Sequence, residues 1–169
     1  MSHADVAPII VVLGHYGAEI ERVISEMPIE LTRNPKPEEG LTSSLRVGLS
    51  SLHDLGQPVM VGLADQPLLD KPSVRALVKA YHDRPPDTLF VVPTRQQQPG
   101  NPVMFSPSVA AEILSKDAHY GGKEWKHDHP GQVFSWETQD RGYFTDIDTP
   151  EDLQALIESQ SKTSRGKAR

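Results

Sequence analysis

The chain of 169 residues contains no cysteine, which excludes disulfides, thiolate metal ligands and cysteine nucleophiles. It has no apolar run near the ~20 residues that a membrane-spanning helix needs. Its opening residues also lack the basic and apolar segments of a secretory signal. We therefore expect a cytoplasmic protein that does not contact a membrane.

Positive charge is scarce in most of the chain. There are 17 basic and 23 acidic residues, for a net charge of −6. Residues 161–169 hold four of the basic residues and no acidic one, so residues 1–160 keep 13 basic residues and a net charge of −10. An acidic body argues against a nucleic-acid partner, because nucleic-acid binding depends on Lys and Arg neutralising phosphates. We predict one domain over residues 1–160 and a disordered basic tail over 161–169.

Strand and helix patterns alternate along the chain. Residues 8–13 and 58–63 are wholly apolar, which is typical of parallel strands covered on both faces. Further strands are predicted at 29–32, 88–92, 102–105, 132–136 and 143–147, and helices at 18–27, 42–55, 72–82, 108–114 and 150–157. This alternation predicts a Rossmann-like three-layer α/β/α sandwich with a mainly parallel sheet. We expect the two apolar runs to be its most buried strands.

The sequence has no G-x-S-x-G elbow, P-loop or G-x-G-x-x-G motif, so candidate site residues are sought where the strands end. Sheets of this class bind ligands beyond the carboxyl ends of their strands. Asp65 follows the second apolar run, where a carboxylate suits a hard cation such as Mg²⁺. An aspartate that starts a turn before Pro67 explains the same position.

A second acidic segment runs from Asp146 to Asp152. Thr149 and Asp152 suit the start of the last helix, as a cap and its reciprocal partner. Asp146 and Asp148 are two residues apart and would share one side of an extended segment. Either one would complete a metal site with Asp65, although acidic residues also favour helix N-termini for their own sake.

A third candidate segment is a glycine turn that leads into a hydroxyl-rich helix start. It contains Gly40, Ser43 and Ser44, with Arg46 one turn further on. Backbone N–H groups at a helix N-terminus suit an anionic or polar ligand. A surface helix capped by Thr42 or Ser43 explains the same residues.

Two further features favour packing or solvent over chemistry. His127 and His129 have no third metal ligand at a supporting spacing, so a solvated loop is the better interpretation. Trp125 and Trp136 are predicted to pack in or beside the core.

Taken in order, five segments resemble motifs of the MobA-like nucleotidyltransferases, and most closely those of the molybdenum-cofactor cytidylyltransferases. The segments are Ile10-Val-Val-Leu-Gly14 with His15, Asn34-Pro with Gly40 and Ser44-Leu-Arg46, Leu63-Ala-Asp65-Gln-Pro67, Gly100-Asn-Pro-Val103, and Asp146-Ile-Asp-Thr-Pro-Glu-Asp152. The resemblance covers nearly the whole chain apart from the tail.

The resemblance implies a fold like that of the nucleotide-diphospho-sugar transferases and a specific reaction. A phosphate of an acceptor such as molybdopterin would attack the α-phosphate of CTP or GTP, and pyrophosphate would leave. Asp65 would hold the catalytic Mg²⁺, with Asp148 as second ligand and Asp146 as the alternative. The residues implied along the nucleotide are Gly40, Ser43, Ser44 and Arg46, and those implied at the acceptor are Gly100, Asn101 and Pro102.

The sequence also departs from the family pattern. Members of the family open with a strand and a glycine-rich basic loop that wraps the triphosphate, whereas this chain begins a few residues before the segment that resembles their second strand. Asn101 stands where cytidylyltransferases often have histidine, and His119-Tyr120 where many relatives have Gly-Asp. We expect the chain as written to be inactive, either as an enzyme with a misplaced start or as a remnant that serves as a binding or interaction module.

Overall fold

Strand β4 (Phe90–Arg95) runs through the middle of the larger sheet in the computed structural model, which describes residues 6–166. Strand β7 (Val133–Glu137) pairs with β4 in parallel along one edge. Strands β5 (Gln98–Pro99) and β6 (Val103–Phe105) pair antiparallel along the other edge. Strand β3 (Val59–Val61) extends the sheet by pairing antiparallel with β6.

A second, smaller sheet holds the first two strands. β1 (Ile10–Leu13) and β2 (Glu30–Arg33) pair in parallel, with Ile10 opposite Glu30. Within the part of the chain that the structure describes, β1 and β3 do not pair with each other. The sheet is therefore divided and mixed. The two longest pairings, β1–β2 and β4–β7, are parallel as predicted. The antiparallel pairings of β4 with β5 and β6 follow from short connections, and β3 also pairs antiparallel with β6.

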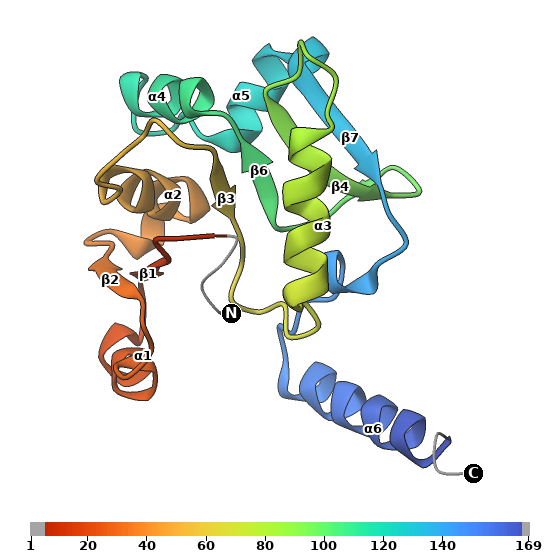
Figure 1. The fold of residues 1–169 in the computed structure, drawn as a ribbon. Coiled ribbons are helices and arrows are strands. Elements are labelled where there is room, and N and C mark those ends of the chain that lie inside the picture. The colour runs from red at the N-terminus through yellow and green to blue at the C-terminus, as the bar shows by residue number, and fades with distance from the viewer. Residues whose placement is uncertain (1–5, 167–169) are drawn as a thin grey trace.

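Helices cover both faces of the larger sheet (Figure 1). The helices of the described chain are α1 (Gly17–Ile24), α2 (Leu41–Ser50), α3 (Lys71–His82), α4 (Pro107–Ser115), α5 (Gly122–Asp128) and α6 (Pro150–Gly166), of which α1 and α6 lie away from the larger sheet. Short 3₁₀ turns occur at Pro37–Glu39, Pro130–Gln132 and Arg141–Tyr143. No helix among residues 6–166 is long and apolar enough to cross a membrane.

The alternation of side chains along β4 produces three layers. Phe90 and Val92 pack in one core cluster with Leu49 of α2 and with residues of α4 and α5. Val91, between them, packs in a second cluster with Leu77 of α3 and with Tyr143. Helix α3 thus covers one face, and α2, α4 and α5 cover the other, so the predicted α/β/α sandwich is confirmed.

The third helix shows how the local sequence specifies an element. Asp70 is its N-cap, and the side chain accepts a hydrogen bond from the backbone N–H of Ser73, at 2.9 Å. Val74, Leu77 and Tyr81 follow at helical spacing and are all buried. The predicted helix over residues 72–82 is therefore confirmed.

The prediction of which strands are most buried is wrong. The first five residues of β4 are buried, whereas β3 and most of β1 are only half-buried. β4 has a neighbouring strand along each edge and helices on both faces, while β1 and β3 each pair along one edge only. An apolar run shows that a strand can be buried, but the neighbouring elements decide whether it is.

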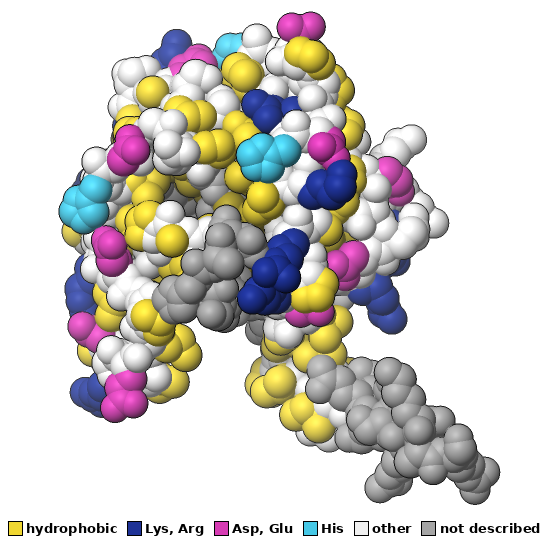
Figure 2. Space-filling model, viewed as in Figure 1, with side chains coloured by type: hydrophobic (Ala, Val, Ile, Leu, Met, Phe, Trp, Pro, Cys, Tyr) yellow, Lys and Arg dark blue, Asp and Glu magenta, His cyan; other side chains and the backbone are white. Residues whose placement is uncertain are grey.

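The apolar face of α1 is also exposed, although its helical pattern is confirmed. Spacing places Ile20, Val23, Ile24 and Met27 on one face, which predicts burial. Ile24 is half-buried, but the exposed fractions of Ile20, Val23 and Met27 are 42%, 79% and 54%, and Met27 lies beyond the end of the helix. α1 lies apart from the larger sheet, and hydrophobic side chains reach the surface over it (Figures 1 and 2). Within residues 6–166 no element covers this face.

Two further predictions of secondary structure are wrong. Residues 143–147 are not a strand, because the backbone makes a 3₁₀ turn at Arg141–Tyr143 and then continues without regular structure. Helix α5 forms where the sequence predicted no helix, and its last turn includes His127, which was assigned to a solvated loop. Burial of Trp125 explains this helix, since the indole packs in the first core cluster.

The predicted boundary at residue 160 does not coincide with the end of an element. Helix α6 continues through Gly166, so residues 161–166 of the predicted disordered tail are helical. Residues 167–169 lie outside the described part of the chain.

Candidate functional site

Asp65 lies in the turn after the carboxyl end of β3. Its side chain is half-buried, and the carboxylate oxygen Oδ1 is buried with no hydrogen-bond partner among the described residues. A buried acceptor without a donor costs about 1–3 kcal/mol, and such groups in native proteins often mark a function. A hard cation fits this position, because Mg²⁺ binds carboxylate oxygens.

The second acidic segment lies against Asp65. The backbone N–H of Ile147 donates to the backbone carbonyl of Asp65, at 2.9 Å. Ile147 stands between Asp146 and Asp148, whose side chains are both exposed. The three aspartates of the predicted metal site are thus neighbours in the fold.

The structure does not bring the three predicted aspartates together as one group of metal ligands. No group of three or more His, Cys, Asp or Glu side chains within residues 6–166 is arranged to hold a metal ion. Mg²⁺ usually takes one or two protein carboxylates and completes its octahedron with waters and phosphates. A site made of Asp65 with Asp146 or Asp148 therefore stays a prediction.

The helix-start function of the last acidic motif is confirmed. Asp152 Oδ2 accepts hydrogen bonds from the backbone N–H and the hydroxyl of Thr149, at 2.9 and 2.7 Å. In return, the hydroxyl oxygen of Thr149 accepts from the backbone N–H of Asp152, at 3.2 Å. These bonds from Thr149 lower the pKa of Asp152. Asp152 therefore stabilises the start of the last helix, and Asp146 and Asp148 remain as the candidate metal ligands.

The predicted acceptor loop meets the same region at the carbonyl oxygen of Tyr143. This oxygen accepts from the backbone N–H of Asn101, at 2.9 Å, and from Nε2 of Gln66, at 3.2 Å. A Cβ atom on Gly100 would lie 2.5 Å from it, so a side chain at this position would force the loop away. Pro102 is buried and follows a cis peptide bond. The Gly100–Pro102 loop therefore lies beside the turn that carries Asp65.

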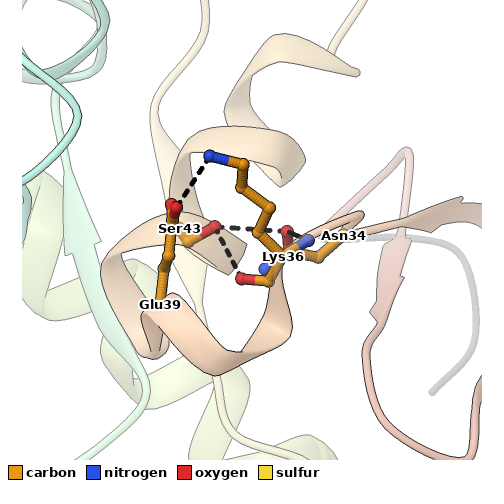
Figure 3. Close-up of polar contacts among 4 residues, drawn as sticks. All are labelled: Asn34, Lys36, Glu39 and Ser43. Atoms are coloured by element: carbon orange, nitrogen blue, oxygen red, sulfur yellow. Dashed lines mark hydrogen bonds and ion pairs between the residues drawn. The ribbon is translucent and has the colours of Figure 1, made fainter.

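The start of α2 forms a second group of polar residues (Figure 3). Asn34 is 5% exposed, and its Oδ1 accepts from the backbone N–H of Lys36 and from the hydroxyl of Ser43. Asn34 Nδ2 donates to the hydroxyl oxygen of Ser44, at 3.1 Å. Lys36 also forms an ion pair with Glu39, at 2.8 Å. The buried asparagine thus holds both predicted serines at the N-terminus of the helix.

Gly40, and not a hydroxyl residue, occupies the N-cap position of α2. The prediction that Thr42 or Ser43 caps this helix is wrong, because the hydroxyl of Ser43 donates to Asn34 and to the carbonyl of Lys36 instead. Gly40 has φ of 84°, a conformation that favours glycine. No atom lies within 4 Å of the place where its Cβ would be, so the helix N-terminus opens on that side. Such an opening suits an anionic ligand.

Arg46 makes extensive contacts within the protein. Its guanidinium donates to the backbone carbonyls of Ile113, Leu114, Lys116 and Tyr120, around the end of α4. Cations at a helix C-terminus are stabilising because they face the carbonyl ends of the dipole. In this arrangement Arg46 connects α2 to α4, and its role along a nucleotide stays a prediction.

The two groups of predicted residues have different hydrogen-bond partners among residues 6–166. No hydrogen bond or ion pair among residues 6–166 joins the start of α2 to the Asp65 turn. A hollow of about 310 Å³ lies elsewhere, at the amino ends of β1 and β2. It is lined by Val6, Ala7, Pro8, Ile9, Pro28, Ile29 and Glu30. None of the predicted site residues lines it.

The histidines near α5 do not form a metal pair. His127 is exposed, whereas the ring of His129 stacks on Trp125 with centroids 4.5 Å apart, and its Nδ1 lies 3.0 Å from the Trp125 carbonyl oxygen. The packing role of both tryptophans is confirmed, since Trp125 is 1% exposed and Trp136 packs against the second core cluster.

Comparison with known families identifies the family of the chain. The model of the MobA-like NTP transferase domain matches residues 1–133. The chain belongs to this family. Four of the five motifs lie within the matched residues, the motif from Asp146 to Asp152 lies beyond them, and the Rossmann-like fold agrees with membership. No curated protein matches the chain.

Several solved structures share the fold. A nucleotidyl transferase from Methanothermobacter thermautotrophicus, Mth528, is 18% identical with a TM-score of 0.71, over 91% of this chain and 73% of its own. The Mycobacterium tuberculosis protein Rv0371c in complex with manganese is 23% identical with a TM-score of 0.63, over 89% and 77%. A molybdopterin-guanine dinucleotide biosynthesis protein A from Archaeoglobus fulgidus is 18% identical with a TM-score of 0.60, over 90% and 78%.

The sequence analysis overlooked two residues that lie in the family motifs. Asn34 and Gln66 are both nearly buried, and each hydrogen-bonds residues of a predicted site. Their positions next to Pro35 and Asp65 in two family motifs were the available signal.

Proposed function

We propose that this protein binds a nucleoside triphosphate, CTP or GTP, with Mg²⁺ and transfers the nucleotidyl group to the phosphate of a small acceptor such as molybdopterin. The observation that carries the proposal is the buried, unpartnered Oδ1 of Asp65, on a residue whose backbone bonds the segment of Asp146 and Asp148. Family membership supplies the reaction class. A protein of this kind would work in the cytoplasm, where nucleoside triphosphates are available.

The chemistry is a displacement at phosphorus. An oxygen of the acceptor phosphate forms a bond to the α-phosphorus, and the bond from that phosphorus to the pyrophosphate oxygen breaks. Mg²⁺ supplies neutralisation of the charge on the phosphate oxygens. Asp65, with Asp148 or Asp146, would hold the ion, and positioning would supply most of the rate.

The remaining residues have positioning roles in this proposal. Gly40, Ser43 and Ser44 at the open N-terminus of α2 would face the nucleotide, since backbone N–H groups and hydroxyls there suit phosphate or ribose oxygens. The Gly100–Pro102 loop, fixed against the Tyr143 carbonyl, would form one wall of the acceptor site.

The test is binding of CTP and GTP by isothermal titration calorimetry, with Mg²⁺ and with EDTA, together with pyrophosphate release in the presence of molybdopterin. Asp65→Asn should abolish the Mg²⁺-dependent part of binding, and Asp87→Asn, an exposed carboxylate before β4, serves as the matched control. Nucleotide binding without pyrophosphate release would support the alternative, an inactive binding module. Absence of nucleotide binding to the unmodified chain would overturn both.

A further inference from the structure

Gln66 has the same unusual feature as Asp65. It is 9% exposed, and its amide oxygen Oε1 is buried with no hydrogen-bond partner among the described residues. The two unpartnered side-chain oxygens, Oδ1 of Asp65 and Oε1 of Gln66, therefore come from consecutive residues of one turn. Retaining two buried acceptors without donors at one place is costly unless a ligand compensates both.

The orientation of the Gln66 amide is determined by its surroundings. Nε2 donates to the carbonyl oxygen of Tyr143, at 3.2 Å, which assigns the other end of the amide as the acceptor Oε1. The same carbonyl accepts from Asn101, so Gln66 is held to a rigid junction between three segments. A hydrogen bond at the far end of a ligating group both orients the group and increases its basicity.

We propose that Gln66 contributes Oε1 as a neutral ligand to the divalent cation held by Asp65. Hard cations accept amide oxygens alongside carboxylates, and one neutral ligand adds coordination without further repulsion between like charges. The segment after Tyr143 carries Asp146 and Asp148 and bonds the backbone of Asp65 through Ile147. One junction thus orients Gln66 and brings the aspartates to the same turn. The inference rests on the cation site of the proposed function.

The experiment uses Mn²⁺ as the probe, with binding followed by the loss of the free-ion electron paramagnetic resonance signal, in the presence and absence of CTP. The variants are Gln66→Met, which keeps the side-chain size and removes both polar atoms, and Gln66→Glu, which keeps an oxygen and adds charge. Asp65→Asn tests the site itself. Gln98→Met, at an exposed glutamine of β5, is the matched control. Near-ultraviolet circular dichroism checks that each variant folds.

We expect Gln66→Met to weaken Mn²⁺ binding about tenfold or more, since even indirect partners of metal ligands are worth about 10–100-fold. Gln66→Glu should bind at least as tightly as the unmodified chain, and Gln98→Met should match it. If Asp65→Asn loses Mn²⁺ while Gln66→Met stays within twofold of the unmodified chain, Gln66 is not a ligand, and the proposed function stands. If Asp65→Asn leaves Mn²⁺ binding unchanged, or the unmodified chain binds none, the Gln66 ligand and the Asp65 cation site both fail.

Discussion

Arg46 illustrates, at the scale of a residue, how one side chain fits two interpretations. The family motif implies a nucleotide contact, but the guanidinium bonds four backbone carbonyls around the end of α4. Hydrogen bonds to a charged group contribute about 1.5–3 kcal/mol, and removing the donor leaves carbonyls unsatisfied. We predict that Arg46→Met lowers the thermal midpoint by about 5–10 °C and leaves the affinity for CTP within a few-fold.

Differential scanning calorimetry and a CTP titration check this prediction. Arg22→Met, at an exposed arginine of α1, is the control for a lost positive charge. A variant that melts like the unmodified chain but no longer binds CTP would show that Arg46 contacts the nucleotide and that its contacts with α4 contribute little.

Asp70 provides a prediction about pH. Hydrogen bonds from Ser73 lower the pKa of this N-cap carboxyl. The folded state therefore favours the ionised form, and the stabilisation is complete above the unfolded pKa of about 4 and is lost as pH falls through the folded pKa. Asp70→Asn keeps a capping oxygen that does not titrate. Its thermal midpoint should fall less between about pH 5 and pH 3 than that of the unmodified chain, whereas equal falls would contradict the assignment.

The candidate site could be predicted only in part from the sequence. Asp65 was proposed from a strand end, and Asp146 and Asp148 from a family motif, because both are local patterns. The importance of Gln66 comes from a carbonyl 77 residues away in sequence, which no local pattern contains. The same holds for Arg46, whose partners lie 67 to 74 residues away.

At the scale of elements, the exposed apolar side chains of α1 and the unpaired edge of β1 favour association between copies of the chain. Among residues 6–166, β1 pairs along one edge, and Ile20 and Val23 of α1 are exposed, as is Met27 just beyond the helix. Unpaired strand edges and exposed apolar faces favour contact between copies. We predict that Val23→Lys shifts the chain toward monomer in concentration-dependent sedimentation, with little change in thermal midpoint, since the Val23 side chain is 79% exposed.

Ala18→Lys is the matched control, because it adds the same charge at another exposed position of α1. It should associate more than Val23→Lys does. If the unmodified chain is monomeric at every concentration, or if the two variants behave alike, the apolar face of α1 does not drive association.

Most elements could be predicted from the sequence because periodicity is local. The runs 8–13 and 58–63 became strands β1 and β3, and residues 72–82 became α3. The predicted strand over residues 143–147 is wrong, because the backbone carbonyl of Tyr143 accepts hydrogen bonds from Gln66 and Asn101 and not from a neighbouring strand. The predicted burial of β1 and α1 is wrong because burial depends on which elements lie alongside. Sequence periodicity does not contain that information.

At the scale of the molecule, helix α2 connects the divided sheet. A Cβ on Gly48 would lie 3.0 Å from Val12 of β1, and Leu49 packs in the core cluster of the larger sheet, with Val59 and Val61 of β3 against it. Both sheets therefore share one covering helix, whose N-terminus carries the predicted nucleotide residues. The residues predicted to contact the nucleotide lie at the start of α2, which packs on β1. The residues predicted to hold the metal lie after β3 and after Tyr143.

The last prediction follows from this division and concerns the rate of the whole reaction. The 169 residues contain no P-loop or G-x-G-x-x-G motif, and the family resemblance implies a glycine-rich basic loop, after a central strand, around the triphosphate. Within residues 6–166 the edges of β1 and β3 are not paired with each other, so a central strand grafted from a relative has two edges to join. Preorganised donors contribute about 10²–10³ each to the rate. We predict that these residues alone release pyrophosphate from CTP or GTP at least about 100-fold more slowly than a version that carries a relative's opening strand and loop. Equal rates for the two purified proteins, with the same Mg²⁺ and molybdopterin, would show that the residues described here suffice to hold the triphosphate.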